Sequence, residues 1–143
     1  MNKLLHKIRN ILQKILNINE NVIYKSDFPE GKLEGKPAQI GAFSVIDCGG
    51  GVKIGKNVKI GYGVVILSVS TIVGDKKEKI IKKPVIIGDN VEIGSHAVIL
   101  PGVKIRNNST IGAGAVVLED TEIPKDSIAV GVPAKVVKKK KNL

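Results

Sequence analysis

Residues 85–117 are VIIGDNVEIGSHAVILPGVKIRNNSTIGAGAVV, in which an aliphatic residue recurs at every sixth position. A second ladder of small or branched residues lies two positions earlier in each hexad. Because residues two apart on a strand point the same way, both ladders face one interior. A six-residue period fits neither an α-helix nor a flat strand, so it predicts an all-β solenoid of short coiled strands. The ladders are Ile87, Ile93, Ile99, Ile105, Ile111 and Val117, and Val85, Val91, Ala97, Val103, Ser109 and Ala115.

The same period runs upstream from residue 40 and lapses at residues 68–83. We therefore expect a β-helix domain over residues 40–137, interrupted by a projecting loop at 68–83 and followed by a basic tail at 138–143. Residues 19–39 are polar and contain glycine and proline, which predicts an irregular lead-in. Cys48 falls in an inward slot and is expected to fill the core rather than to act as a nucleophile.

An amphipathic pattern covers residues 1–18 and predicts a short N-terminal α-helix. Two roles are open for it. Its basic side is typical of a helix that lies on a membrane surface. Alternatively, it covers the open end of the solenoid or packs against a neighbouring chain, which we favour because a solenoid end needs covering. The apolar residues are Leu4, Leu5, Ile8, Ile11, Leu12 and Ile15, and the cations are Lys3, Lys7, Arg9 and Lys14.

Composition narrows the class of protein. The chain has 143 residues, a net charge of +10 and only 3% aromatic residues. A basic surface favours anionic small ligands, but no nucleic-acid-binding module accompanies the charge, so we expect no nucleic-acid partner. A single cysteine allows no internal disulfide and favours a cytoplasmic protein. No apolar run reaches membrane-spanning length and no signal peptide is evident, so we expect no stable membrane insertion.

With three hexads in a turn of 18 residues, six outward aliphatic residues fall on one side of the solenoid. The other two sides carry mostly charged or polar residues between glycines. A contiguous outward apolar patch predicts a partner surface. The six residues are Val65, Leu67, Val98, Leu100, Val116 and Leu118.

Three segments, IGDNVEIGSHAVILPGVKI (87–105), IGAGAVV (111–117) and GVPAKVV (131–137), resemble the hexapeptide-repeat acyltransferases. Within that family they are most similar to the galactoside and maltose O-acetyltransferase branch. The resemblance implies a left-handed parallel β-helix, a handedness that the period alone does not predict. It also implies acetyl-CoA as a substrate and a homotrimer whose subunits meet on the aliphatic side.

The resemblance places contacts to acetyl-CoA at Ser95, Ala113 and Lys135. Ser95 and Ala113 belong to the edge where Gly63, His96 and Gly114 are expected to stack. Lys135, in the GVPAK segment, is expected to meet a CoA phosphate as a point charge.

The catalytic residues depart from the family pattern. Thr71 stands where relatives place their catalytic histidine, and residues 68–83 contain no histidine. Asp47 lies near the position of the family's acceptor-contacting aspartate, although a turn residue before glycines is an equal interpretation. His96 is the one candidate general base in the repeats; the alternative is a histidine that lines the groove or the surface.

The sequence thus predicts an acetyltransferase that acts on a sugar or nucleotide-sugar acceptor, at an amine or a hydroxyl, at a trimer interface. The missing histidine favours an amine, which attacks a thioester without a strong base. A catalytically silent relative that binds CoA or serves as a scaffold is the alternative. A metalloenzyme like the γ-class carbonic anhydrases would need several converging histidines, whereas the chain has only His6 and His96. We therefore expect no metal.

Overall fold

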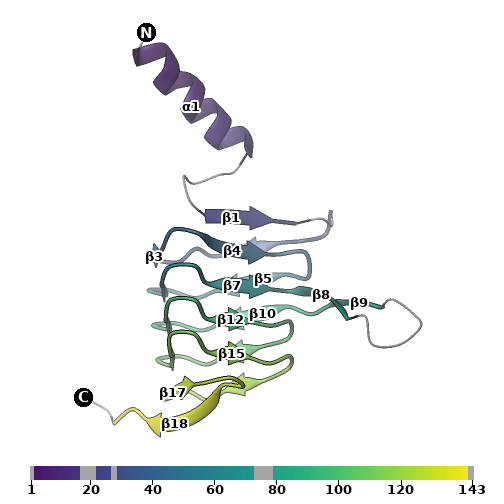
Figure 1. Ribbon diagram of the computed structural model, residues 1–143, viewed down its shortest axis with the longest axis vertical. Helices are drawn as coiled ribbons and strands as arrows, with labels where there is room; N and C mark the ends of the chain where they lie inside the picture. The colour runs from purple at the N-terminus through teal and green to yellow at the C-terminus, as the bar shows by residue number, and fades with distance from the viewer. Residues whose placement is uncertain (1, 17–21, 27–28, 73–78, 142–143) are drawn as a thin grey trace.

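The computed structural model describes residues 2–16, 22–26, 29–72 and 79–141. They form an N-terminal helix, α1 (Asn2–Leu16), and short strands stacked into a solenoid of about five turns (Figure 1). Each coil runs along the front strands in Figure 1, returns behind them and steps toward the C-terminal end, so the winding is left-handed. The predicted left-handed parallel β-helix is confirmed.

Three parallel sheets form the three sides of the solenoid. Face A contains β1 (Val22–Lys25), β4 (Ser44–Asp47), β7 (Val65–Leu67), β12 (Val98–Ile99) and β15 (Val116–Val117). Face B contains β2 (Leu33–Glu34), β5 (Val52–Ile54), β10 (Val85–Ile87), β13 (Lys104–Ile105) and β16 (Glu122–Ile123). Face C contains β3 (Gln39–Ile40), β6 (Lys59–Ile60), β11 (Glu92–Ile93), β14 (Thr110–Ile111), β17 (Ser127–Val130) and β18 (Lys135–Lys139), the last antiparallel to β17.

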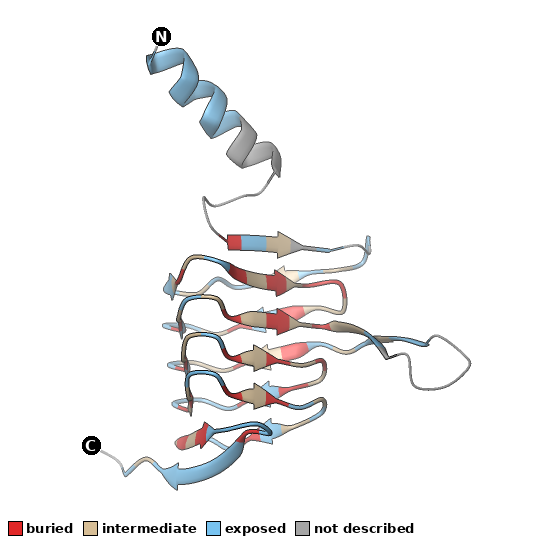
Figure 2. Ribbon diagram, viewed as in Figure 1, coloured by how far each residue is buried: buried red, intermediate tan, exposed pale blue. Residues whose placement is uncertain are grey.

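The core is the pair of ladders that the period predicts. Ile99 is in register with Ile66 on one side and Val117 on the other, and all three are fully buried. In the middle coils of all three faces, buried residues alternate with more exposed ones along the chain (Figure 2). Cys48 is 8% exposed within this core, where burial raises the pKa of its thiol. Its predicted role as core filler is confirmed.

An asparagine ladder supports the corner between faces B and C. Asn57, Asn90, Asn108 and Asp126 stack there with φ between 55° and 61°. This left-handed conformation suits asparagine and aspartate better than most residues. Each amide in turn donates to the side-chain oxygen of the residue in the next coil, at 3.0 Å. The ladder therefore satisfies the turn conformation and ties the coils together.

The segment expected to be a projecting loop contains a two-stranded antiparallel ribbon. Strands β8 (Val69–Ile72) and β9 (Lys79–Lys82) pair with each other and project from the solenoid (Figure 1); residues 73–78 between them lie outside the described residues. Lys83 at the ribbon's base contacts the Asp120 carboxylate at 2.5 Å, a hydrogen bond that raises the lysine's pKa. The lapse of the hexad pattern marked the insertion but did not distinguish a loop from a ribbon.

The solenoid begins earlier than expected. Strands β1 and β2, which lie within the predicted irregular lead-in, are in register with β4 and β5. Val22 is buried at 4% exposure, although its spacing from Leu33 is not hexameric. The basic tail also begins as part of a strand, because β18 continues to Lys139.

Helix α1 does not cover the end of the solenoid with its described side chains. It extends beyond that end (Figures 1 and 2), and Leu4, Leu5, Ile8 and Ile11 are 44–64% exposed. Of the two roles favoured from the sequence, an end cap for the chain's own solenoid is therefore wrong for these side chains, whereas packing against a neighbouring chain stays a prediction. Periodicity predicted the helix, but the contacts of its apolar side depend on tertiary structure.

Candidate active site

The edge between faces C and A holds the predicted stack, and we call it the glycine edge. It consists of Gly63, His96 and Gly114, whose φ values are 61°, 60° and 68°, with the residue that precedes each of them. The His96 N–H donates to the Tyr62 carbonyl at 2.8 Å, and the Gly114 N–H to the Ser95 carbonyl at 2.9 Å. Each coil therefore turns through a residue in the left-handed conformation, and the backbone N–H of that residue donates a hydrogen bond to the preceding coil.

A line of glycines lies beside this edge because the coils approach closely there. A Cβ at Gly61 would lie 2.7 Å from the Ser95 nitrogen, and one at Gly112 would lie 2.6 Å from a methyl carbon of Val130. Gly94 is equally crowded by the backbone of Ala113. Such distances are shorter than non-bonded atoms allow, so glycine is required for coil stacking.

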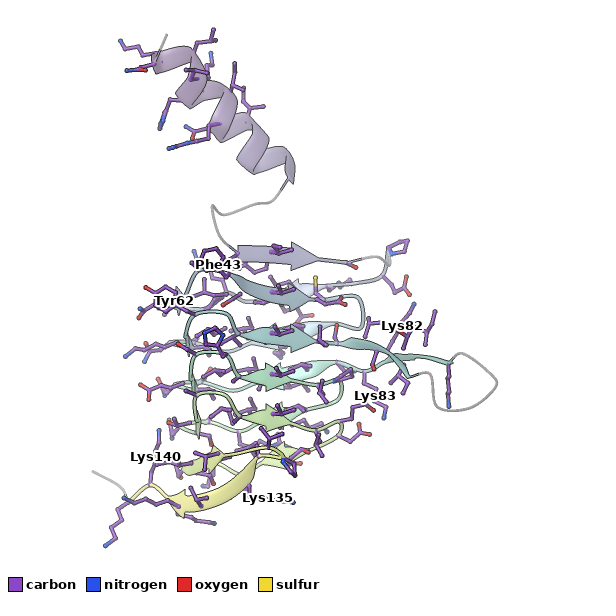
Figure 3. The ribbon with its side chains drawn as sticks, in the orientation of Figure 1. Phe43, Tyr62, Lys82, Lys83, Lys135 and Lys140 are labelled. Carbon is purple, nitrogen blue, oxygen red and sulfur yellow. The ribbon has the colours of Figure 1, made fainter. Side chains whose placement is uncertain are left out.

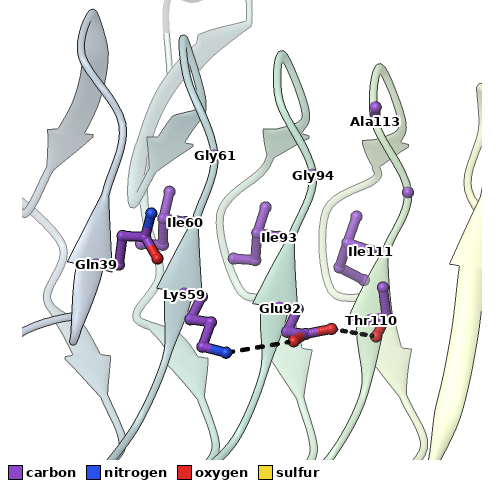
Figure 4. A pocket seen from close by; sticks show the side chains of 11 residues that line it. Gln39, Lys59, Ile60, Gly61, Glu92, Ile93, Gly94, Thr110, Ile111 and Ala113 are labelled. Atoms are coloured by element: carbon purple, nitrogen blue, oxygen red, sulfur yellow. Dashed lines mark hydrogen bonds and ion pairs between the residues drawn. The ribbon is translucent and has the colours of Figure 1, made fainter.

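A groove of about 350 Å³ follows the glycine line on the outer surface of face C (Figure 4). On its polar side, Lys59 Nζ lies 3.9 Å from Glu92 Oε1, and the Thr110 hydroxyl donates to Glu92 Oε2 at 3.5 Å. The volume is in the lower part of the range for small-molecule sites. The groove is lined by Gln39, Lys59, Ile60, Gly61, Glu92, Ile93, Gly94, Thr110, Ile111, Gly112 and Ala113.

The three residues assigned to acetyl-CoA lie along this part of the molecule. Ala113 lines the groove itself. Ser95 occupies the same position one coil earlier, where its hydroxyl oxygen accepts the Tyr62 N–H at 3.1 Å. Lys135 begins β18 and is exposed (Figure 3). It pairs with Val130, whose side chain lies next to Gly112. The set runs from the middle of the glycine edge to the C-terminal end of face C.

The opposite edge of face A, which we call the hairpin edge, holds Asp47, Ser68 and the base of the β8–β9 ribbon. Asp47 Oδ1 accepts the Gly49 N–H at 2.9 Å, so the turn role considered for this residue is present. Its main-chain carbonyl also accepts the hydroxyl of buried Ser68 at 2.6 Å. Thr71 is exposed on β8, where it is in register with Ile80.

Within a single chain, the candidate catalytic residues do not lie together. Asp47 and Thr71 belong to the hairpin edge, His96 belongs to the glycine edge, and face A separates them. The His96 side chain is exposed beside Gly63 and makes no hydrogen bond to another described residue. A histidine base is ordinarily oriented by a hydrogen-bonded third group. The described part of a single chain supplies no such group to His96.

Two exposed aromatic residues at the glycine edge were missed by the sequence reasoning. Phe43 is 77% exposed and Tyr62 is 64% exposed (Figure 3). They occupy successive coils, because the Gly63 N–H donates to the Ala42 carbonyl at 2.9 Å. Phe43, with a φ of 64°, occupies the position of Gly63 one coil earlier, whereas Tyr62 occupies the position that precedes Gly63. In a chain with 3% aromatic residues, two rings at adjacent positions of one edge were a usable signal.

Neither a metal cluster nor a membrane-spanning helix is found in the described part of the chain. No three His, Cys, Asp or Glu side chains gather there into a group that could hold a metal ion. No helix within the described ranges combines the length and apolar character needed to cross a membrane.

Two known repeat families match the solenoid. Residues 84–119 match the family described as bacterial transferase hexapeptide (six repeats), and residues 35–68 match the hexapeptide repeat of succinyl-transferase. Both matched blocks are repeats of the hexapeptide-repeat acyltransferases. The two matches flank the β8–β9 ribbon, so the ribbon is an insertion between matched repeats.

Curated hexapeptide-repeat acetyltransferases are similar to parts of this chain. Galactoside O-acetyltransferase of Escherichia coli (strain K12) is 54% identical over 55 residues, which are 38% of this chain and 26% of that protein. Serine acetyltransferase of Staphylococcus aureus (strain Mu50 / ATCC 700699) is 43% identical over 101 residues, which are 71% of this chain and 46% of that protein. The chain thus spans less than half the length of these relatives.

A solved structure with the same fold is AntD, an N-acyltransferase from Bacillus cereus, as a variant in complex with dTDP and coenzyme A. The TM-score is 0.71 at 20% identity, and the match covers 87% of this chain and 80% of AntD. At this identity the likeness concerns the fold.

Proposed function

We propose that this hexapeptide-repeat chain transfers an acetyl group from acetyl-CoA to a sugar or nucleotide-sugar acceptor. The observation that carries the proposal is the similarity of 71% of the chain to a serine acetyltransferase and of 38% of it to a galactoside O-acetyltransferase. The groove beside the glycine edge supports it, because its volume of about 350 Å³ lies within the range for small-molecule sites.

The proposed site lies between copies of the chain. Face A presents an outward aliphatic surface formed by the six residues that the sequence analysis identified, with Val98 in register with Val65 and Val116. A homotrimer that buries face A would bring the glycine edge of one subunit toward the hairpin edge of the next. His96 and Ser95 would then share a site with Asp47 and Thr71 of a neighbouring copy.

Acetyl-CoA is proposed to lie along the glycine edge. Backbone groups near Ser95 and Ala113 would hold the pantetheine arm, and Lys135 would meet a phosphate at the C-terminal end. Lys135 suits this role because an exposed ammonium is a flexible point charge. Neighbouring cations in β18 raise the local positive potential, which favours an anionic ligand.

An amine is the acceptor group that the site suits better. A neutral amine attacks the thioester carbonyl carbon and a C–N bond forms as the C–S bond breaks. The proton lost from the nitrogen passes to the CoA sulfur, directly or through water, so that CoA leaves as the free thiol. The protein then mainly positions the reactants and stabilises the oxyanion with backbone N–H groups. The unoriented His96 fits this chemistry better than base-dependent attack by a hydroxyl. A variant of AntD has been solved with dTDP-4-amino-4,6-dideoxyglucose and coenzyme A, and this complex supports the choice of an amino nucleotide sugar.

Phe43 and Tyr62 are proposed to contact the acceptor. Exposed aromatic rings stack on nucleobases and pack against the apolar faces of sugar rings. Their place on the glycine edge puts them above Ser95 and His96, toward the N-terminal end of the proposed acetyl-CoA path.

A thiol-release assay tests the proposal. The full chain is incubated with acetyl-CoA and a panel of amino sugars, hydroxy sugars and nucleotide sugars, with L-serine included because of the serine acetyltransferase relatives. We expect CoA release above hydrolysis with an amino-sugar acceptor. Acetyl-CoA binding by calorimetry without release on any acceptor would favour the silent CoA-binding alternative. Release with L-serine alone would contradict the proposed acceptor class.

A further inference from the structure

Helix α1 presents an apolar strip that the described part of the chain leaves uncovered. Leu4, Leu5, Ile8 and Ile11 are spaced to lie on one side of the helix and are 64%, 58%, 44% and 47% exposed. Figure 2 shows the described turns of α1 as exposed, beyond the end of the solenoid. Aliphatic side chains gathered on one exposed face indicate an interaction surface.

The polar side of α1 is entirely cationic or neutral. Its sequence, NKLLHKIRNILQKIL, contains no Asp or Glu. At 100° per residue the full apolar pattern spans a sector about 120° wide, with Lys3 and Lys7 beside one border and Arg9 toward the other. Cations that flank an apolar strip can extend to a charged surface while the strip is buried.

We propose that α1 binds the surface of an anionic lipid bilayer and attaches the protein peripherally to it. Leu4, Leu5, Ile8 and Ile11 would enter the boundary between headgroups and acyl chains, while the lysines meet headgroup phosphates. The helix would lie in the plane of the interface, since 15 residues extend only about 22 Å, less than the hydrocarbon thickness. This proposal does not rest on acetyl transfer and goes beyond it.

Charge favours a lipid surface over a second copy of α1 as the occupant. Helices that associate through apolar seams ordinarily pair opposite charges beside the seam. Copies of α1 would bring Lys3, Lys7 and Arg9 together without one acidic residue, and their repulsion would oppose association. Anionic headgroups supply the missing negative charge. An isolated helix of this length is also marginal in water, so an interface that buries its strip would stabilise it.

Vesicle flotation of the full chain tests the proposal. One set of vesicles contains phosphatidylglycerol and phosphatidylcholine in equal parts, and the other contains phosphatidylcholine alone. We expect binding to the anionic vesicles that weakens with salt, because salt screens headgroup attraction, and little binding to the neutral ones. The double variant Lys3→Gln/Lys7→Gln should bind about 10–30-fold more weakly.

Two matched controls separate α1 from general charge. Lys138→Gln/Lys139→Gln removes the same charge from β18 and should keep vesicle binding within about twofold, because β18 is at the other end of the solenoid (Figure 1). Ile8→Asp should reduce binding by at least about 30-fold, whereas Asn10→Asp adds the same charge on the polar side and should reduce it about fivefold. Circular dichroism checks that every variant retains the solenoid.

Three outcomes would overturn the proposal. The first is no binding to either vesicle set. The second is an equal loss of binding in the α1 and β18 lysine variants, which would show charge attraction without a role for the helix. The third is that Ile8→Asp lowers the oligomeric state without lipid and leaves vesicle binding intact, which would make a second copy the occupant of the strip.

Discussion

His96 combines a left-handed backbone conformation with an imidazole that no hydrogen bond to another described residue holds in one orientation. Its φ of 60° is tolerated by histidine and asparagine better than by most residues. His96→Asn therefore removes the imidazole and keeps a side chain suited to the turn. If positioning and backbone N–H groups suffice, steady-state turnover on an amine acceptor should fall less than about tenfold, because no proton transfer to His96 is lost.

The contrary result for His96 is equally clear. A fall of about 10²–10⁴-fold with acetyl-CoA binding retained, on a hydroxyl acceptor only, would make His96 the general base. His96→Ala serves as a comparison, because it also removes the imidazole but fits the left-handed turn less well. A loss seen with alanine and absent with asparagine would be a backbone effect.

Lysine 135 offers a test of the proposed phosphate contact. Lys135→Glu should weaken acetyl-CoA binding by about tenfold or more, because an attractive charge becomes repulsive. The loss should be much smaller for the dephospho analogue, which lacks the terminal phosphate. Titration calorimetry measures both. Lys139→Glu is the matched control, since it makes the same charge change on the same strand; equal losses in the two variants, or for the two ligands, would remove the specific contact.

At the scale of an element, the asparagine ladder is the device that turns each coil from face B to face C. Asn90→Ala removes hydrogen bonds to Asn57 and Asn108 and places alanine at φ 55°. We expect destabilisation of about 2–3 kcal/mol from the left-handed backbone and the lost exposed bonds together. Asn90→Gly keeps the backbone preference and should cost about 1 kcal/mol.

Urea denaturation at one fixed protein concentration measures both Asn90 variants. The difference between alanine and glycine isolates the backbone conformation from the hydrogen bonds. Equal destabilisation by the two substitutions would show that the left-handed conformation at residue 90 contributes nothing to the free energy of unfolding beyond the hydrogen bonds.

At the scale of the whole molecule, face A is the proposed assembly surface. The unaltered protein should be a trimer in solution, because its outward aliphatic rows otherwise remain exposed to water. Val98→Asp should dissociate it, since a buried unpaired carboxylate costs several kcal/mol. Multi-angle light scattering gives the mass of each species.

Ile86→Asp is the control for assembly. Ile86 faces outward on face B between Lys53 and Lys104, so a carboxylate there is solvated and near opposite charges. This variant should keep the mass of the unaltered protein. A stable monomer for the unaltered chain would contradict the proposed interface and the shared site with it.

The six-residue period by itself determined the solenoid, the two buried ladders and the alignment of Val65, Val98 and Val116. These features repeat locally, because each hexad makes the same contacts with the coil before and after it. The period also predicted the stack at Gly63, His96 and Gly114. Handedness came from family resemblance, and the left-handed winding of the structure agrees with it.

Tertiary structure alone decided the features that do not repeat. The first coil forms although Val22 and Leu33 are off the hexad spacing, because β4 and β5 supply an edge for β1 and β2 to extend. The β8–β9 ribbon depends on pairing between segments outside the repeat. Phe43 and Tyr62 come together at the glycine edge only once the coils are stacked. Helix α1 has the same apolar pattern whether it caps a solenoid or stands free. Only the exposure of its apolar side chains in the tertiary structure distinguishes the two.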